Sequence, residues 1–174
     1  MVDLTGLHKH FILEHLGEGE VAVDFTMGNG NDTLFLSELS KEVIAFDISA
    51  EAIRRTKEKT HGRNNVTLIH DSHVNVDKYV RNRVRLFIFN LGYLPHSEET
   101  TVSKAGDTLL AFQKAYELLE DNGYIVITFY LGHKGGKDEF YLLDDYLRKN
   151  RFQITETYSQ NKIDSPVTYI IRKR

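Results

Sequence analysis

The sequence predicts a doubly wound α/β fold of the Rossmann-like type, with a mostly parallel sheet of seven strands that ends in an antiparallel hairpin. From residue 20 onward, short apolar runs rich in β-branched residues alternate with longer stretches of helical periodicity, which is typical of βαβ units. The last two apolar runs have only a short polar link between them. We therefore expect them to pair as a hairpin at the edge of the sheet.

Each element follows from a local pattern, beginning with a helix expected over residues 7–16. Apolar runs predict strands at 21–25, 43–47, 66–69, 84–90 and 124–129. The run at 84–90 is apolar almost throughout, which marks a strand covered on both faces and places it mid-sheet. Helical spacing predicts helices at 32–39, after residue 50, at 109–119 and at 137–149, with a helix or loop at 76–83. The segment 121–123 is expected to stop the helix before it, and the final hairpin pairs 152–158 with 167–171.

Length and composition indicate one domain over residues 1–174, with residues 1–19 as an N-terminal helical segment. The chain lacks a run of about 18 or more apolar residues and a signal-peptide pattern, so we expect a cytoplasmic protein that does not enter a membrane. Cysteine is absent, which excludes disulfides, thiolate metal ligands and a cysteine nucleophile. The histidines lack the paired spacing of a zinc site, and no metal is predicted. The small size of the chain makes a homodimer plausible.

The net charge of −3 argues against a protein that is basic overall and binds nucleic acid through its whole surface. Basic residues nevertheless gather in four clusters: Arg54, Arg55, Lys57, Lys59 and Arg63; Arg81, Arg83 and Arg85; Arg148, Lys149 and Arg151; and Arg172, Lys173 and Arg174. Each cluster is either a solvated surface or part of a patch for RNA.

A glycine-rich turn follows the first predicted strand, with Gly28 and Gly30 at its centre. In an open α/β sheet nucleotide-like ligands bind at this place, and glycines let a ligand approach the backbone amides. The glycine spacing alone fits a dinucleotide as well. Asp24 decides between the two, because a carboxylate there would repel a pyrophosphate but suit the cationic amino group of a methionine moiety. The turn therefore favours S-adenosylmethionine over NAD.

Two further carboxylates follow the next strands. Asp47 ends the second strand, where a carboxylate accepts hydrogen bonds from the hydroxyls of an adenosine ribose. Asp71 comes just after the third strand and could reach the adenine amino group, with an ordinary loop-capping role as the alternative. The residues predicted to bind the cofactor are Asp24, Thr26, Gly28, Asn29, Gly30, Asn31, Asp32, Thr33, Asp47, Ile48, Asp71, Ser72 and Asn90.

Asn90 follows the mid-sheet strand, at the end that would face the methyl group of the cofactor. An amide carbonyl and the neighbouring backbone carbonyl can together accept hydrogen bonds from an amine and aim its lone pair at the sulfonium. This arrangement suits methyl transfer to nitrogen and predicts Asn90 as a catalytic residue. Tyr93 is predicted to stack on a base. The alternative is a strand-terminating turn with an aromatic lid.

A second loop, at 130–137, follows the fifth predicted strand and opens onto the same edge. Its glycines and two lysines could hold RNA phosphate, and His133 could take a proton from an ammonium substrate. His96 is the alternative base.

Five segments together resemble a known family: DFTMGNGNDT, FDIS, NLGYLP, GHKGGKDE and SQNKIDSP. They are similar to small bacterial methyltransferases that were first labelled rRNA methylases and later assigned to the wobble uridine of tRNA. The resemblance runs nearly end to end, and it implies a class I methyltransferase fold. It also implies that tRNA is the substrate, and that the exocyclic amine of 5-aminomethyl-2-thiouridine is methylated to the methylaminomethyl form. The chain departs from the family pattern at 96–99 and 164–166.

Other functions stay open at this point. The same cofactor could serve methylation of ribosomal RNA, a protein or a small amine. A dinucleotide oxidoreductase is disfavoured by Asp24 and by the terminal hairpin. A binding module that keeps the cofactor fold without catalysis would lose no activity when Asn90 is replaced.

Overall fold

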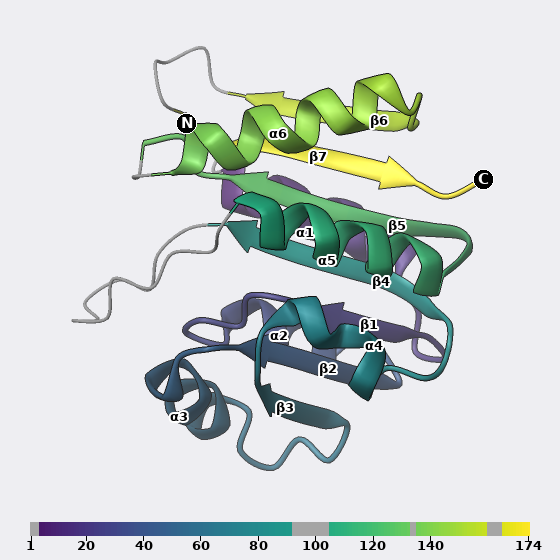
Figure 1. Ribbon diagram of the computed structural model, residues 1–174. Helices are drawn as coiled ribbons and strands as arrows, with labels where there is room; N and C mark the ends of the chain where they lie inside the picture. The colour runs from purple at the N-terminus through teal and green to yellow at the C-terminus, as the bar shows by residue number, and fades with distance from the viewer. Residues whose placement is uncertain (1–3, 92–104, 133–134, 160–164) are drawn as a thin grey trace.

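The computed structural model describes residues 4–91, 105–132, 135–159 and 165–174, and its framework is one seven-stranded sheet between two layers of helices (Figure 1). The strands are β1 (Val21–Asp24), β2 (Glu42–Asp47), β3 (Val66–His70), β4 (Val84–Leu91), β5 (Leu119–Phe129), β6 (Ile154–Ser159) and β7 (Val167–Arg172). Their order across the sheet is β3-β2-β1-β4-β5-β7-β6. Strands β1 to β5 pair in parallel, whereas β7 is antiparallel to both β5 and β6. The predicted doubly wound fold and its terminal hairpin are confirmed.

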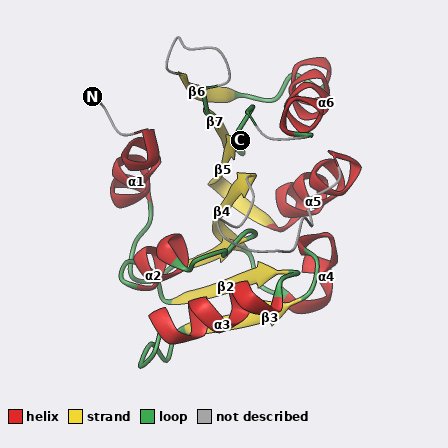
Figure 2. Cartoon of the chain, turned by 90° about the vertical axis from the view of Figure 1, so that its left-hand side faces the viewer, coloured by secondary structure: helices red, strands yellow, loops and turns green. Residues whose placement is uncertain are grey.

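Helices cover both faces of this sheet (Figure 2). They are α1 (Leu4–His15), α2 (Asn31–Ser37), α3 (Ala50–Lys59), a 3₁₀ turn η1 (His73–Asn75), α4 (Val76–Tyr79), α5 (Ala105–Leu118) and α6 (Gly136–Lys149). Side chains of α1 and α2 pack on one face, and those of α4, α5 and α6 pack on the other. No helix in the described ranges combines the length and the apolar character that a bilayer crossing needs.

Strand β4 lies at the centre of the sheet because both of its faces are apolar. Phe87 and Phe89 join the core cluster that includes α5 and α6, whereas Leu86 and Ile88 join the cluster that includes α1 and α2. All four side chains are buried. The continuous apolar run that predicted a mid-sheet strand is explained by this double coverage.

The segment 121–123 differs from the prediction. It was expected to be the stop after a helix, but it lies inside β5, which begins at Leu119 directly after α5. Pairing with β4 jumps from Val84↔Leu119 to Leu86↔Tyr124, so the intervening residues form a bulge. Asn122 has a positive φ of 64°, and its backbone N–H donates to the carbonyl of Lys173. The turn residues therefore form a bulge inside β5 rather than a loop between two elements.

Candidate active site

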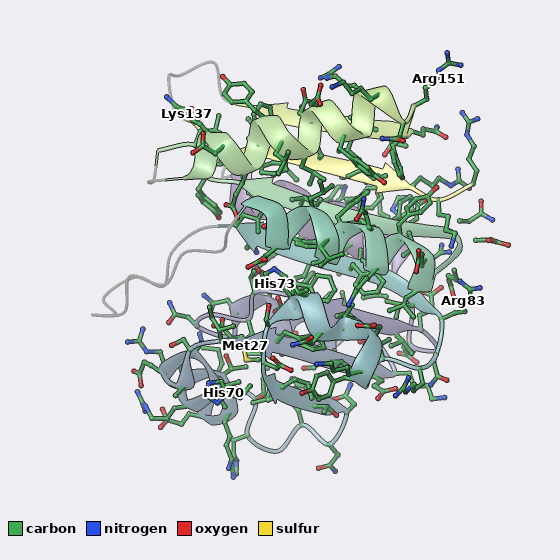
Figure 3. The ribbon with its side chains drawn as sticks, in the orientation of Figure 1. Met27, His70, His73, Arg83, Lys137 and Arg151 are labelled. Carbon is green, nitrogen blue, oxygen red and sulfur yellow. The ribbon has the colours of Figure 1, made fainter. Side chains whose placement is uncertain are left out.

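The predicted site residues gather at the carboxyl ends of β1, β2 and β4, which point the same way because these strands are parallel (Figure 1). The turn between β1 and α2 lies in the middle of this edge, with Met27 labelled there (Figure 3). The backbone N–H of Met27 donates to the carbonyl of Phe46 in β2, and that of Phe25 donates to the carbonyl of Ile88 in β4. The turn is thus held between its two neighbouring strands.

Gly30 brings this turn against α3. Its φ is +74°, in the left-handed region, and it caps the N-terminus of α2. A Cβ atom at Gly30 would lie 2.9 Å from Cα of Thr56. Only glycine combines this backbone angle with so close an approach. The hydroxyl of Thr56 donates to the carbonyl of Gly28, which ties the two segments together at 3.2 Å.

Asp24 lies fully buried beneath the turn, with both carboxylate oxygens engaged. One oxygen accepts the backbone N–H of Thr26 at 3.1 Å, and the other accepts the hydroxyl of Thr33 at 2.7 Å. Burial raises the pKa of Asp24 to about 7, with a further contribution from the charge of Asp32, against the two hydrogen bonds that lower it. The carboxyl therefore changes charge near neutral pH.

Asp47, at the end of β2, also faces the turn. One of its oxygens accepts the backbone N–H of Gly28 at 3.0 Å, and the other accepts that of Ser49 at 2.9 Å. The next residue, Ile48, is 44% exposed and offers an apolar surface beside this carboxylate. The structure therefore brings Asp47, the residue predicted to bind the ribose, into contact with the glycine turn.

Several other predicted cofactor residues already have partners in the protein. Asn29 accepts a hydrogen bond from Arg55 at 2.9 Å, and Asn31 accepts one from Lys59, so both asparagines are tied to α3. Asp71 accepts hydrogen bonds from the backbone of Ser72, from Asn75 and from Tyr79. The hydrogen bonds from Asn75 and then Tyr79 lower the pKa of Asp71. These contacts match the alternative loop-capping role, and contact with adenine stays a prediction for Asp71.

Asn90 is held from two sides at the end of β4. Its backbone N–H donates to the hydroxyl of Thr26 at 2.7 Å, which joins it to the glycine turn. Its side-chain amide donates from Nδ2 to Oδ2 of Asp32, in the first turn of α2. Asn90 and Asp32 are 58 residues apart in the chain, so only the folded sheet brings them together.

Three residues that the sequence reasoning passed over also border this site. In α1, Nε2 of His8 lies 3.7 Å and Nζ of Lys9 lies 3.6 Å from Oδ1 of Asp32. His73 is buried after β3, and its Nδ1 lies 3.2 Å from the carbonyl oxygen of Phe25. Burial lowers the pKa of His73. His8 could have been found from its spacing, because it precedes the buried Ile12 by one helical turn.

Some predicted residues lie outside the described part of the chain. These are Tyr93, His96 and His133, so their predicted roles in stacking and proton transfer stay predictions. Among the described residues, no group of three or more His, Asp or Glu side chains is arranged to hold a metal ion.

The described side chains suit a cationic adenosine derivative. Asp24, Asp32 and Asp47 place three carboxyl groups around one glycine turn, which favours a positive ligand over a pyrophosphate. The left-handed turn at Gly30 leaves no side chain over the backbone at that position. The negative charges and the glycine turn therefore lie together at one edge of the sheet.

A family model described as "Putative rRNA methylase" matches residues 43–173, from β2 to the end of β7. The chain belongs to this rRNA methylase family. A Clostridium thermocellum protein described as a "putative rRNA-methylase" has 34% sequence identity and a TM-score of 0.91 over 100% of this chain and 99% of its own. A Streptococcus mutans methyltransferase solved in complex with SAH has 34% identity and a TM-score of 0.90 over the same shares.

A curated relative is the Arabidopsis thaliana "tRNA (mnm(5)s(2)U34)-methyltransferase, chloroplastic". It is 30% identical over 154 residues, which cover 79% of this chain but only 56% of the relative. The chain therefore spans about half the length of that plant protein.

Like its family, this chain is a methyltransferase with S-adenosylmethionine as its cofactor. The prediction of S-adenosylmethionine over NAD, made from Asp24 beside the glycine turn, is confirmed. The resemblance to the methyltransferase family, read from the sequence motifs, is confirmed as well.

Proposed function

We propose that this enzyme methylates the exocyclic amine of 5-aminomethyl-2-thiouridine at the wobble position of tRNA and forms 5-methylaminomethyl-2-thiouridine. The observation that carries the proposal is Asn90, a side-chain amide at the carboxyl end of the central strand β4. The name of the Arabidopsis relative describes a methyltransferase for this nucleoside class, which supports the same acceptor.

Asn90 suits a methyl acceptor that carries a polar hydrogen, such as an amine, better than a carbon acceptor. Its Nδ2 is used by Asp32, so Oδ1 is the atom that can accept a hydrogen bond from a substrate N–H. An amine held in this way turns its lone pair away from the amide and toward the methyl donor. The predicted catalytic residues Asn90, Tyr93 and His133 would then hold the amine, stack on the base and take up the proton.

S-adenosylmethionine supplies a methyl group on a sulfonium, and the transfer leaves S-adenosylhomocysteine as a neutral thioether. The amine nitrogen forms the new bond to carbon and becomes a secondary ammonium, which then loses one proton. The protein has to orient the neutral amine and exclude water. Asp24 is proposed to hold the amino group of the cofactor, and Asp47 its ribose. The turn around Gly30 is proposed to let the cofactor approach the protein backbone.

The test is mass spectrometry of nucleosides from tRNA that lacks the final methyl group. We expect this tRNA, incubated with the enzyme and S-adenosylmethionine, to lose aminomethyl-thiouridine and gain its methylaminomethyl form in equal amount. Ribosomal RNA from the same cells is the parallel substrate, because the family name refers to it. Methylation of rRNA with none of tRNA would contradict the proposal and keep only the methyltransferase activity.

For RNA we propose a second contact surface, at the opposite end of the sheet from the cofactor. Arg172 pairs with Tyr124 at the start of the regular part of β5, so it lies at the amino ends of the parallel strands. A groove there has aromatic side chains in its wall and arginines around it; its lining residues are Tyr116, Tyr146, Asn150, Arg151, Phe152, Gln153, Arg172 and Arg174. Two basic clusters that are 21 residues apart in sequence, from Arg151 to Arg172, thus meet in space.

These arginines differ from most others on the surface. Within the described ranges, Arg151, Arg172 and Arg174 have no carboxylate at ion-pair distance, whereas Arg54 and Arg63 are paired with glutamates. Arginines without a carboxylate partner that lie beside aromatic rings favour phosphate contacts and base stacking. A folded tRNA is larger than this domain and can reach both ends of the sheet.

Replacing Arg151, Arg172 and Arg174 together with glutamine is expected to weaken binding of whole tRNA by about tenfold or more, with a shallower salt dependence. Fluorescence polarisation at several salt concentrations measures both. Arg63→Gln is the matched control, because it removes an exposed arginine whose charge is already paired with Glu38 at 2.7 Å. Equal losses of RNA affinity in the triple variant and in the control would contradict the proposal that this groove binds RNA.

The whole chain, residues 1–174, is proposed to act as one catalytic domain, because one sheet carries both the cofactor edge and this groove. We further propose the cytoplasm as its location and a homodimer as its state. Light scattering of the purified protein tests the homodimer, and a monomeric mass would exclude it.

A further inference from the structure

Asp32 connects three elements that border the reacting end of the site. It lies in the first turn of α2, accepts a hydrogen bond from Asn90 of β4 on Oδ2, and faces His8 and Lys9 of α1 on Oδ1. Its side chain is 20% exposed, and that of His8 is 6% exposed. The carboxylate is therefore enclosed mainly by protein groups, and each of its oxygens has a different role.

An ionised Asp32 allows the Asn90 amide to face it in one orientation only. The NH₂ group donates a charge-assisted hydrogen bond, whereas the flipped amide would direct its carbonyl lone pairs at a negative charge. The orientation of an asparagine amide is assigned from its hydrogen-bond network. Among the described contacts, the partner of Nδ2 of Asn90 is Oδ2 of Asp32, which accepts a hydrogen bond and has no proton to donate when ionised. Oδ1 of Asn90 must then point away from Asp32.

Helix α1 provides the groups that keep Asp32 in this state. Neither ring nitrogen of His8 has a hydrogen-bond partner among the described residues, and Nε2 lies 3.7 Å from Oδ1 of Asp32. Lys9 approaches the same oxygen to 3.6 Å and also lies over the ring of Phe35. Oδ1 of Asp32 is thus the polar atom that the described contacts place beside the buried ring of His8.

We propose that Asp32, clamped by His8 and Lys9 of α1, is a positioning residue that fixes the Asn90 amide so that Oδ1 meets the acceptor amine. The choice of an amine rests on the function proposed above, but the orientation of the amide does not. Asp32 acts through Asn90 and does not itself touch the reacting atoms.

The charges around Asp32 agree with this role. Burial raises the pKa of Asp32, but the neighbouring His8, followed by Lys9, outweighs burial, so that the pKa is lowered overall. The nearby Asp24, on β1, has its pKa raised to about 7 in part by the charge of Asp32. The pKa values of the two carboxyl groups thus differ, and Asp32 is ionised at a pH where Asp24 is partly protonated.

The first experiment reads the amide directly by NMR, with asparagine side chains labelled with ¹⁵N. The Asn90 NH₂ signals are assigned by their loss in Asn90→Asp. We expect Asp32→Asn to move these signals toward the positions of solvent-exposed amides. The control Asp77→Asn, which removes a carboxylate bonded to Lys114 on another part of the surface, is expected to leave them in place. Unmoved signals in Asp32→Asn overturn the proposal, whatever the methyl acceptor is.

The second experiment exchanges the two partners. Asp32→Asn and Asn90→Asp are each expected to lower kcat by about tenfold or more, because each removes the matched donor and acceptor. In the double variant D32N/N90D the amide at position 32 can donate to one oxygen of the carboxylate at position 90. The other oxygen of that carboxylate remains for the amine. We expect the double variant to be faster than either single variant. If the fold-loss of kcat in the double variant equalled the product of the fold-losses in the two single variants, the pairing of Asp32 with Asn90 would be contradicted.

The histidine is tested with a conservative pair of variants. His8→Gln keeps a polar N–H group beside Asp32, whereas His8→Leu removes it. The leucine variant is expected to shift the Asn90 signals in the same direction as Asp32→Asn, and the glutamine variant to restore them. Equal spectra for the two variants would remove His8 from the proposal, and failure of tRNA methylation in every sample would speak against the acceptor alone.

Discussion

Replacing Gly30 with alanine is expected to destabilise the protein by about 2–4 kcal/mol and to weaken cofactor binding by about tenfold or more. Two costs add at this position. The φ of +74° lies in the left-handed region, where a side chain costs about 1 kcal/mol. The new Cβ would also lie 2.9 Å from Cα of Thr56, a backbone atom that cannot rotate away. The turn and α3 must therefore separate.

Gly62 is the matched control for this change. Its φ is +83°, so alanine meets the same backbone penalty, but a Cβ there has nothing within 4 Å. Gly62→Ala is expected to cost only about 1 kcal/mol and to leave cofactor affinity unchanged. Urea unfolding and calorimetric titration with S-adenosylhomocysteine measure the two effects. Equal losses for the two variants would show that the approach of Thr56 has no energetic importance.

Much of the fold could be predicted because it depends on local patterns. The apolar runs separated by helical stretches gave the parallel strands, and the missing helix between the last two runs gave the hairpin of β6 and β7. Asp24, Asp47 and Asn90 could be placed together without a structure, since the carboxyl ends of parallel strands share an edge. The bulge in β5 could not, because Asn122 and Gly123 satisfy a turn and a bulge equally well.

The contacts within the site are less predictable because they depend on tertiary packing. The pairing of Asn90 with Asp32 requires the exact start of α2 relative to β4, and the approach of His8 requires the docking of α1 on the sheet. Likewise, Arg151 and Arg172 share a groove only because β7 reverses direction beside β5. Each strand end is encoded locally, whereas the distances between side chains on different elements are not.

Asp24 gives the free enzyme a stability that falls as pH rises. Its pKa is raised from 3.8 to about 7 in the fold, mainly by burial, so the folded state holds its proton more tightly than the unfolded state. The contribution is fully present below about pH 4 and is lost as pH rises through about 7. A change of about 3 pKa units corresponds to about 4 kcal/mol at most. Asp24→Asn is expected to flatten this dependence between pH 4 and 7.

Cofactor affinity is expected to follow the opposite course. S-adenosylmethionine carries an ammonium and a sulfonium, and both favour the ionised form of Asp24, so binding below about pH 7 must release its proton. Affinity is then expected to rise by about tenfold per pH unit from pH 5.5 to 7 and to level off above.

Calorimetry in buffers of different ionisation enthalpy measures the released proton. The side chains of His8 and His73 also border this region, so the comparison of wild type with Asp24→Asn isolates the contribution of the Asp24 carboxyl. If Asp24→Asn kept the same pH dependence, the charge of Asp24 would have no part in holding the cofactor. If the variant bound weakly at every pH, without the rise, the buried carboxylate would be the group that selects a cationic cofactor over a dinucleotide.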